Sequence, residues 1–535
     1  MWRHDGNILS GETNPSLLLS NLRVDQSGAY EVTATSPMGA VTNATAYLVV
    51  SNAPSVVVIR GPYLQCITTS NTIVRWRTDN WSLGSVRFST APDAMAWESF
   101  GGQATNNHSV TLTNLSPGAK YFYSVWSGTN RLVSGTNCYV QTDSGQRTPT
   151  RIWAIGDVGT ATYGAPWPAM VRNAYLQSSP QRHTDVCLML GDNAYEIGTD
   201  AEYQVAVFDV FSSMLSRFAV WPTIGNHEAF GGLSAFLNIF SLPMAGEAGG
   251  VPSGSELYYS FDNANVHFVC INSETSSKAP GSPMLTWLEQ DLAANTKDWT
   301  IAYWHSPPYS YGSHNSDVER NLIQMREQVV PILENYGVDL VLCGHSHSYE
   351  RSYLLDGHYG SATTLAPSMI KDSGSGRTND TGAYRKPSTG SAGRQGTVYV
   401  VAGSAGQTSG VSPHPAMLVS LNHLGSVVID IDGDRLDARF LRETGAVDDH
   451  FTILKGAAAE PLYIATFRAS GGTVTAKWKS VAGRVYRIES TLSLASAQWN
   501  LVVDNIMATG ATTTWSGLAD SPTGSAYYRV VQVSP

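Results

Sequence analysis

The rhythm of hydrophobic and polar positions changes twice along the chain. Before residue 147 and after residue 462, short runs alternate apolar and polar residues, as at 72–78 and 121–126. Alternation with a period of two is typical of half-buried strands. Between these points, short apolar runs are separated by segments with helical spacing, which predicts strands alternating with helices. The pattern therefore predicts an α/β domain with β modules before and after it.

Residues 1–52 are expected to form a partial β module. Residues 25–32, with Trp2 upstream, resemble the later half of an immunoglobulin-like domain, but Val32 stands where that family has its second Cys. Half a β-sandwich exposes its core face, so this module is expected to be poorly ordered, to borrow a neighbour or to be truncated. We favour truncation.

Residues 53–146 and 462–535 predict two further β modules. In the first, Trp76 and residues 115–121 (Leu-x-Pro-Gly-x-x-Tyr) resemble a fibronectin type III domain, which usually serves as a spacer. The second follows a Gly- and Ala-rich linker at 455–461. Its aromatic residues are expected to pack in a core, and a face that binds a surface or a carbohydrate is the alternative.

Residues 147–456 predict the α/β domain. Six buried strands are expected from its apolar runs, at 151–155, 186–190, 219–224, 266–272, 299–305 and 338–343. Helical spacing at 284–292 and 322–336 predicts two helices, and Gly337 is well placed to end the second. Residues 356–396 are rich in Gly, Ser and Thr without periodicity, so we expect a functional lid or a disordered insert.

Length and charge narrow the functional classes. A chain of 535 residues should divide into several domains. Its formal net charge of −10 argues against a protein that binds nucleic acid or an anionic membrane through a basic surface. No apolar run approaches the ~18 residues of a membrane-spanning helix.

Cysteines and the N-terminus bear on the cellular compartment. The five cysteines show no Cys-x-x-Cys spacing, so buried thiols are expected, and a disulfide between Cys66 and Cys138 stays open. No apolar leader follows Met1, so either the protein stays inside the cell or its true start lies upstream. We expect the second, with a secreted, periplasmic or cell-surface location.

Five turns at the ends of predicted strands carry residues that could bind a metal. They are Gly156-Asp157, Gly191-Asp192 with Tyr195, Gly225-Asn226-His227-Glu228, His305, and Gly344-His345-Ser346-His347. Glycine permits a sharp exit from a strand, and α/β folds place their chemistry at the carboxyl ends of strands. A single Asp or His would more often cap a turn or fill a core. Five such turns in order predict one shared pocket.

The predicted donors are two carboxylates, one amide, one phenol and three imidazoles, without a thiolate. They are Asp157, Asp192, Tyr195, Asn226, His305, His345 and His347. This mixture of oxygen and nitrogen suits borderline or hard transition metals. Because one metal uses four to six donors, the set predicts two metals that share a bridging carboxylate.

The ordered series of motifs resembles the calcineurin-like metallophosphoesterases. Tyr195, three residues after Asp192, and residues 344–351 (Gly-His-x-His-x-Tyr-Glu-Arg) resemble the purple acid phosphatase branch. The resemblance covers about residues 55–455, including the fibronectin-like module that precedes the catalytic domain in that family. It implies a multidomain protein whose α/β domain has two β-sheets sandwiched together and flanked by helices.

Carried over residue by residue, the resemblance implies a ferric site and a divalent site. The ferric ion would be held by Asp157, Tyr195 and His347. The divalent ion (iron, zinc or manganese) would be held by Asn226, His305 and His345. Asp192 would bridge the two, and the cations would attract a phosphate despite the net negative charge of the chain.

The activity that the resemblance implies is hydrolysis of phosphate monoesters, of the acid phosphatase type, with a metal-bound hydroxide attacking phosphorus in line. His227, directly after a ligand, is expected to bind substrate or to protonate the leaving alkoxide. His314 is the second candidate, although many plant members carry two adjacent His in this loop and here Asn315 follows. His358 and His414 lie in or near the insert, and surface placement is expected for both.

Two other hypotheses remain. A phosphodiesterase or nucleotide pyrophosphatase would use the same metal core, and loops 306–316 and 356–396 would set the choice by closing around the leaving group. A surface-binding protein with an inactive α/β domain is less consistent with the sequence, because inactive relatives usually lose at least one donor. The expected partners are small-molecule phosphate esters, with no nucleic-acid scaffold and no membrane span.

Overall fold

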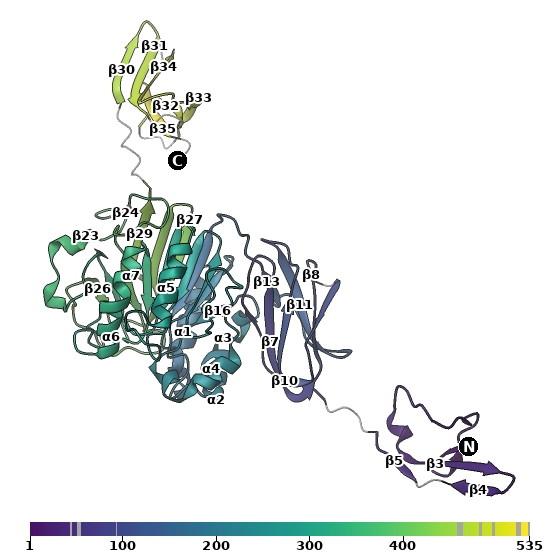
Figure 1. The fold of residues 1–535 in the computed structure, drawn as a ribbon. Coiled ribbons are helices and arrows are strands. Elements are labelled where there is room, and N and C mark those ends of the chain that lie inside the picture. Colours follow the sequence, from purple (N-terminus) through teal and green to yellow (C-terminus); the bar gives the residue numbers. More distant parts are fainter. Residues whose placement is uncertain are drawn as a thin grey trace. The chain divides into compact units, whose positions relative to one another are not determined.

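The computed structural model describes residues 1–42, 45–50, 55–92, 94–456, 464–480, 484–494, 498–519 and 526–532 (Figure 1). By internal packing the chain divides into two units. The first contains Met1–Pro62, Val74–Leu112 and Tyr121–Cys138, and the second contains Tyr63–Ile73, Thr113–Lys120 and Tyr139–Pro535. The expected module boundary at 52–53 and most of the expected linker at 455–461 lie outside the described residues.

The N-terminal residues form a small sheet with the order β2-β1-β3-β4 and with β5 paired to β3. Its strands are β1 (Trp2–His4), β2 (Asn7–Ile8), β3 (Gly28–Ser36), β4 (Gly39–Thr42) and β5 (Ala46–Leu48), with the short helix η1 (Val24–Gln26). Tyr30 is the one buried hydrophobic residue among the described positions of this region, whereas Leu18, Tyr47 and Val49 are largely exposed. The sheet therefore has an apolar surface and almost no core of its own.

The next strands form two sheets. One has the order β10-β7-β6, and the other has the order β12-β11-β8-β9 with β13 on β11. The strands are β6 (Val58–Gln65), β7 (Thr72–Ser82), β8 (Gly84–Ser89), β9 (Trp97–Phe100), β10 (Thr105–Leu112), β11 (Lys120–Ser127), β12 (Asn130–Val133) and β13 (Tyr139–Gln141). Trp76 is buried and stacks on His108. Cys66 and Cys138 are free thiols, and Cys66 Sγ donates a hydrogen bond to the carbonyl of Ser241.

The α/β domain contains two seven-stranded sheets (Figure 1). The first has the order β16 (Val220–Pro222), β15 (Val186–Met189), β14 (Thr150–Ile155), β27 (Gly425–Asp432), β28 (Arg435–Arg442), β29 (Val447–Lys455) and β24 (Tyr384–Lys386). The second has the order β17 (Tyr259–Asn263), β18 (Val266–Cys270), β19 (Trp299–Trp304), β20 (Leu340–Cys343), β25 (Val398–Ala402), β21 (Tyr349–Ser352) and β26 (Met417–Leu421). Strands β14, β15 and β16 run parallel, as do β18, β19, β20 and β25, so each sheet gathers several carboxyl ends at one edge.

Helices pack on both sheets. The tyrosine Tyr175 of α1 stacks on Trp153 of β14, and Leu288 of α5 and Leu333 of α7 share a buried cluster with β19 and β20. The helices are η2 (Val158–Tyr163), α1 (Trp167–Ser178), α2 (Asp200–Tyr203), η3 (Gln204–Asp209), α3 (Val210–Leu215), η4 (Glu228–Gly232), α4 (Leu233–Ile239), α5 (Pro283–Ala294), α6 (Arg320–Gln324), η5 (Met325–Val329) and α7 (Val330–Asn335). The predicted class, an α/β domain of two sheets with helices and with β modules on either side, is confirmed.

The Gly-rich insert at 356–396 is folded into the domain. It contains η6 (Ala362–Thr364), η7 (Pro367–Met369) and β23 (Ile370–Asp372), which pairs with β22 (Leu354–Leu355). Its strand β24 extends the first sheet beside β29, and the buried Lys386 forms an ion pair with Asp339. The expectation of disorder is wrong, because backbone pairing and a buried ion pair hold the segment where hydrophobic periodicity is absent.

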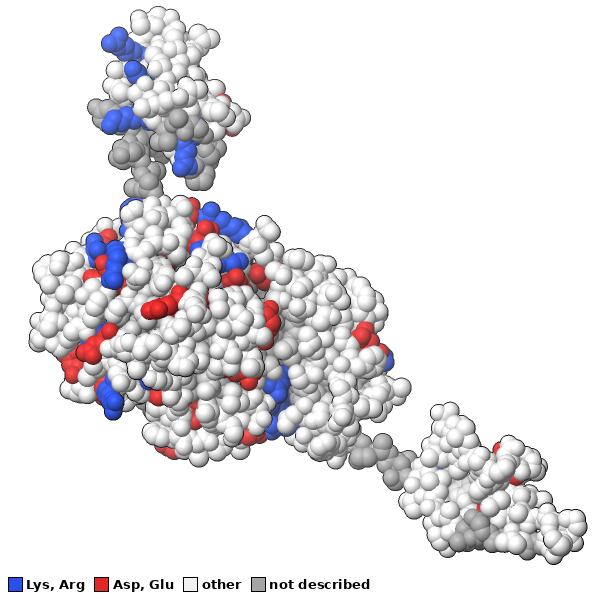
Figure 2. Space-filling model, in the orientation of Figure 1, with Lys and Arg blue, Asp and Glu red and all other residues white. Residues whose placement is uncertain are grey.

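The C-terminal residues form two three-stranded sheets, β30-β31-β34 and β33-β32-β35. The strands are β30 (Ile464–Ser470), β31 (Thr473–Lys479), β32 (Val485–Thr491), β33 (Asn500–Met507), β34 (Thr512–Leu518) and β35 (Tyr527–Gln532). Trp478, Tyr486 and Ile488 form a buried cluster between them. In the described part of the chain, no helix is long and apolar enough to cross a membrane. On the face shown in Figure 2, acidic and basic side chains are interspersed among wide uncharged areas.

Candidate metal centre

The predicted donors leave the carboxyl ends of five strands in the two sheets. Asp157 follows β14, Asp192 follows β15 and Asn226 lies beyond β16 in the first sheet. In the second sheet, His305 follows β19 and His345 follows β20. The edges where these strands end therefore supply every turn of the predicted series.

The glycines in these turns are explained by close approach. A Cβ on Gly225 would lie 2.0 Å from Asp192 Oδ1, and one on Gly191 would lie 2.5 Å from His305 Nδ1. Any side chain at either position would displace a predicted ligand. Gly191 and Gly225 thus make room for the donor of a neighbouring turn.

A first group of donors surrounds Nε2 of His305, whose side chain is fully buried. Nδ1 of His305 donates to the carbonyl of Leu190 at 2.8 Å. Its Nε2 then lies 3.0 Å from Asn226 Oδ1, 3.3 Å from Asp192 Oδ1 and 3.2 Å from His345 Nδ1. In neutral His305 this nitrogen presents a lone pair, so these atoms offer a set of ligands to a cation.

A second group joins Asp157, Tyr195 and His347. His347 Nε2 lies 3.6 Å from Asp157 Oδ1 and 3.5 Å from the Tyr195 hydroxyl. The other ring nitrogen, Nδ1, is 3.0 Å from Ser409 Oγ, which orients the imidazole. Nε2 is therefore the nitrogen available to a metal.

Asp192 lies between the two groups. Its carboxylate faces His305 and also interacts with the Tyr195 hydroxyl. Burial, followed by the charges of Asp157 and Asp192, raises the pKa of Tyr195 well above its ordinary value. A phenolate at this position therefore requires a nearby cation.

The donor set fits bound metal cations. Asp157 and Asp192 are 0% and 2% exposed, and within the described residues neither forms an ion pair with a Lys or Arg. Burial lowers the pKa of His305, but the Asp192 carboxylate outweighs it and raises that pKa well above its usual value. In the absence of a metal, a proton on His305 supplies the positive charge beside Asp192. A buried, ionised carboxylate is stable when a cation or hydrogen-bond donors accompany it, and bound metal ions would supply that charge here.

Glu228 holds two of the turns together, and sequence reasoning assigned it no role. Its side chain is fully buried and accepts hydrogen bonds from four backbone N–H groups. The donors are Asp192 N at 3.1 Å, Asn193 N at 2.8 Å, Ala194 N at 3.1 Å and Gly225 N at 2.7 Å. The carboxylate thus fixes the turn after β15 against the turn after β16. Its position directly after His227 was the only signal in the sequence.

His227 and His314, the two predicted proton donors, lie beside the two groups of candidate metal ligands. His227 Nδ1 donates to the carbonyl of Glu196 at 2.6 Å, and its Nε2 is 3.8 Å from Asp192 Oδ2. The ring of His314 stacks on that of His345 with centroids 3.6 Å apart. The structure therefore brings all nine predicted site residues into one region.

Glu319 is a second residue that sequence reasoning missed. Its Oε2 is 2.9 Å from His314 Nδ1 and 3.7 Å from His345 Nε2, and its Oε1 accepts from the backbone of Asn315. Burial alone would raise the pKa of Glu319, but hydrogen bonds from His345 and His314 lower it to about 2. Its place directly before α6 gave no sign of this role.

His358 and His414 are buried, so the expected surface placement is wrong. Their side chains are 0% and 1% exposed. His358 stacks on Tyr309, and His414 packs edge-on against Tyr311. Both tyrosines belong to the loop that carries His314, so these two imidazoles pack against that loop.

Comparison with known proteins agrees with this architecture. Residues 150–349 match the family model described as calcineurin-like phosphoesterase. Purple acid phosphatase 15 of Arabidopsis thaliana is 28% identical over 278 residues, which is 46% of this chain and 49% of that protein. Acid phosphatase type 7 of Mus musculus is 27% identical over 265 residues, which is 46% of this chain and 56% of that protein. The chain thus spans about half the length of these curated relatives.

A solved structure shows the same fold. The purple acid phosphatase PPD1 from yellow lupin seeds aligns with a TM-score of 0.59 and 17% identity, covering 80% of this chain and 79% of that one. At this identity the likeness concerns the fold alone. Residues 150–349 therefore form a calcineurin-like phosphoesterase domain, and the chain is related to the purple acid phosphatases.

Proposed function

We propose that the domain hydrolyses phosphate monoesters at a centre of two metal ions. The proposal rests on the position of Asp192, which lies between the group of candidate ligands around His305 and the group that contains Asp157, Tyr195 and His347. A ferric ion would be held by Asp157, Tyr195 and His347. A divalent ion (iron, zinc or manganese) would be held by Asn226, His305 and His345. When bound, the metals would polarise the phosphate ester and lower the pKa of water.

The side chains of the protein orient the ligands and move the proton. The carbonyl of Leu190 fixes the tautomer of His305, and Ser409 orients His347. His227 holds its Nδ1 proton on the carbonyl of Glu196, so Nε2 is free to carry a proton to the leaving alkoxide. Glu319 holds the imidazole of His314.

The test compares two substrates on the full-length protein loaded with iron and zinc. Turnover of p-nitrophenyl phosphate should exceed that of bis(p-nitrophenyl) phosphate. A preference for the diester would contradict the monoesterase proposal, and no turnover of either would refute hydrolysis.

The residue-level test is His227→Gln. It should lower kcat about 100-fold or more, the scale of a lost general acid, while the metal content stays unchanged. His4→Gln in the N-terminal sheet is the matched control and should leave both quantities as they are. Loss of metal in His227→Gln would contradict the role assigned to this side chain.

A further inference from the structure

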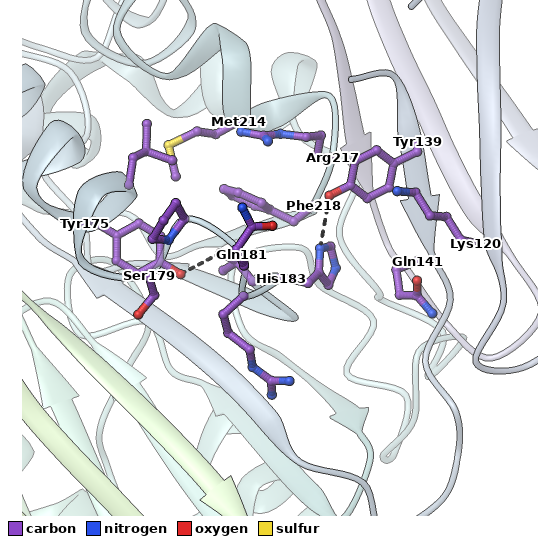
Figure 3. Close-up of a pocket in the computed structure, with 14 residues that line it drawn as sticks. Lys120, Tyr139, Gln141, Tyr175, Ser179, Gln181, His183, Met214, Arg217 and Phe218 are labelled. Carbon is purple, nitrogen blue, oxygen red and sulfur yellow. Dashed lines mark hydrogen bonds between the residues drawn. The ribbon is translucent and has the colours of Figure 1, made fainter. Parts of the chain in front are cut away.

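A cavity of ≈ 240 Å³ lies beside the first sheet of the α/β domain. Figure 3 shows its lining residues. Thr184 lies just before β15 and Phe218 just before β16, so the cavity is at the amino ends of these strands. The proposed metal ligands follow the carboxyl ends of the same strands. The four residues of β15 alone separate the two sites by about 13 Å. All residues that line the cavity belong to the second packing unit.

The lining of this cavity is basic. Lys120, Arg182, Arg217 and His183 contribute to it, and none of the lining residues carries a carboxylate. Asp185 lies just outside, where its Oδ2 is 3.6 Å from Arg182. The cavity therefore keeps a surplus of positive charge on a chain whose formal net charge is −10.

The positive charges of the cavity lining act on the imidazole of His183. Burial, followed by the positive charges of Arg182, Lys120 and Arg217, lowers the pKa of His183 to about 4. His183 is thus neutral at pH 7, and the three cationic side chains line the same cavity as its ring. An anion that entered beside it would meet all three charges.

Arg217, which lines the cavity, has a side-chain donor without an acceptor among the described residues. Its Nε is buried and has no hydrogen-bond acceptor within the described part of the chain. A buried donor without a partner is costly, and a charge-assisted bond to an oxyanion would relieve that cost. Arg217 lines the same cavity as Lys120, whose Nζ lies 3.7 Å from the centre of the Tyr139 ring.

The remaining walls combine aromatic and apolar side chains with the polar side chains of Gln141, Ser179, Gln181 and Thr184. Figure 3 shows Tyr139 and Lys120 on one side, Tyr175 on the other, and Phe218 and His183 between them. A volume of ≈ 240 Å³ equals about eight water molecules, which exceeds orthophosphate and falls below the ~300 Å³ at which pockets for drug-sized ligands begin. This space suits one ring with one charged group.

We propose that this cavity is a second ligand site, which binds a small aromatic oxyanion, a phosphate or carboxylate group attached to one ring. Arg217 and Lys120 would hold the oxyanion, and Tyr139 and Phe218 would contact the ring. The site is independent of the proposed phosphatase activity, because it shares no residue with the metal centre.

Isothermal titration calorimetry on the full-length, metal-loaded protein tests this site. The probes are phenylphosphonate, which resists hydrolysis, benzoate and orthophosphate. The titrations are repeated in Asp192→Asn, which disables the metal centre and leaves the cavity intact. We expect one site for phenylphosphonate or benzoate to remain in Asp192→Asn. That result would also stand if the phosphatase proposal failed.

Arg217→Gln and Lys120→Gln should each weaken this remaining site about ten-fold or more, as for a lost charge-assisted hydrogen bond. Arg131→Gln, an exposed strand position, is the matched control and should leave the affinity unchanged. Lys120→Gln keeps the test decisive if Arg217→Gln does not fold. The proposal is overturned if neither aromatic probe binds Asp192→Asn, if orthophosphate binds as tightly as both, or if the folded variants keep full affinity.

Discussion

The most informative single change is Glu228→Gln. This substitution keeps the size of the side chain and replaces one carboxylate oxygen by an NH2 group. In the protein, Oε1 accepts from Asn193 N and Ala194 N, and Oε2 accepts from Asp192 N and Gly225 N. Whichever oxygen is replaced, two backbone N–H groups then face a donor.

The magnitude follows from this geometry. A hydrogen bond to a charged acceptor contributes about 1.5–3 kcal/mol, so two lost bonds should cost about 3–6 kcal/mol of unfolding free energy. A typical domain has only about 5–15 kcal/mol. We therefore expect Glu228→Gln to be strongly destabilised and to lose metal, because the turns that carry Asp192 and Asn226 are no longer held against each other.

The assay is urea unfolding of the metal-free protein followed by tryptophan fluorescence, together with metal analysis of the loaded protein. Burial and the Asp192 carboxylate raise the pKa of Glu228 to about 7, so the measurement is made at pH 8, where the carboxylate is mostly ionised. Glu289→Gln, on the exposed side of α5, is the matched control and should change stability by less than about 0.5 kcal/mol. A loss below about 1 kcal/mol in Glu228→Gln with full metal content would refute the reasoning.

Two further predictions concern other parts of the domain. Burial would lower the pKa of His267, but hydrogen bonds with Asp262 and Asp291 raise it to about 9. Because this exceeds the ordinary value of about 6.5, the stabilisation is complete below pH 6.5 and about 3 kcal/mol is lost as the pH rises through 9. Urea unfolding at pH 6.5 and 10 should show this loss in the wild type and not in His267→Gln; equal pH dependence would contradict it. Glu319→Gln should lower kcat about ten-fold by loosening the imidazole that it binds, and rates equal to those of Glu327→Gln, an exposed control, would argue against that role.

The sequence predicted the strand ends well because the signal there is local. Runs such as 186–190 are apolar on every residue and too short for a typical helix, which favours a buried strand, and the glycine and the donor follow directly. The structure adds the reason for the glycines, since Gly225 and Gly191 each lie against a donor from another turn. That contact joins segments far apart in the chain, so no local pattern could reveal it.

The role of Glu228 and the burial of His358 and His414 depend on contacts between segments far apart in the chain. Glu228 accepts hydrogen bonds from backbone N–H groups about 35 residues away, and such a side-chain acceptor leaves no pattern in the sequence. His358 and His414 were expected at the surface because they lie in or near the loop-rich insert. Their burial comes from Tyr309 and Tyr311, which belong to a different loop.

The central claim is that seven side chains hold two metal ions through a shared Asp192. Metal analysis of the iron- and zinc-loaded protein, read together with its visible spectrum, tests it most directly. The account predicts two metal ions per wild-type chain, loss of both in Asp192→Ala, and a visible absorption band of the oxidised protein that disappears in Tyr195→Phe because a phenolate bound to ferric iron gives charge transfer. One metal ion per wild-type chain, two retained in Asp192→Ala, or a band unchanged in Tyr195→Phe would contradict it.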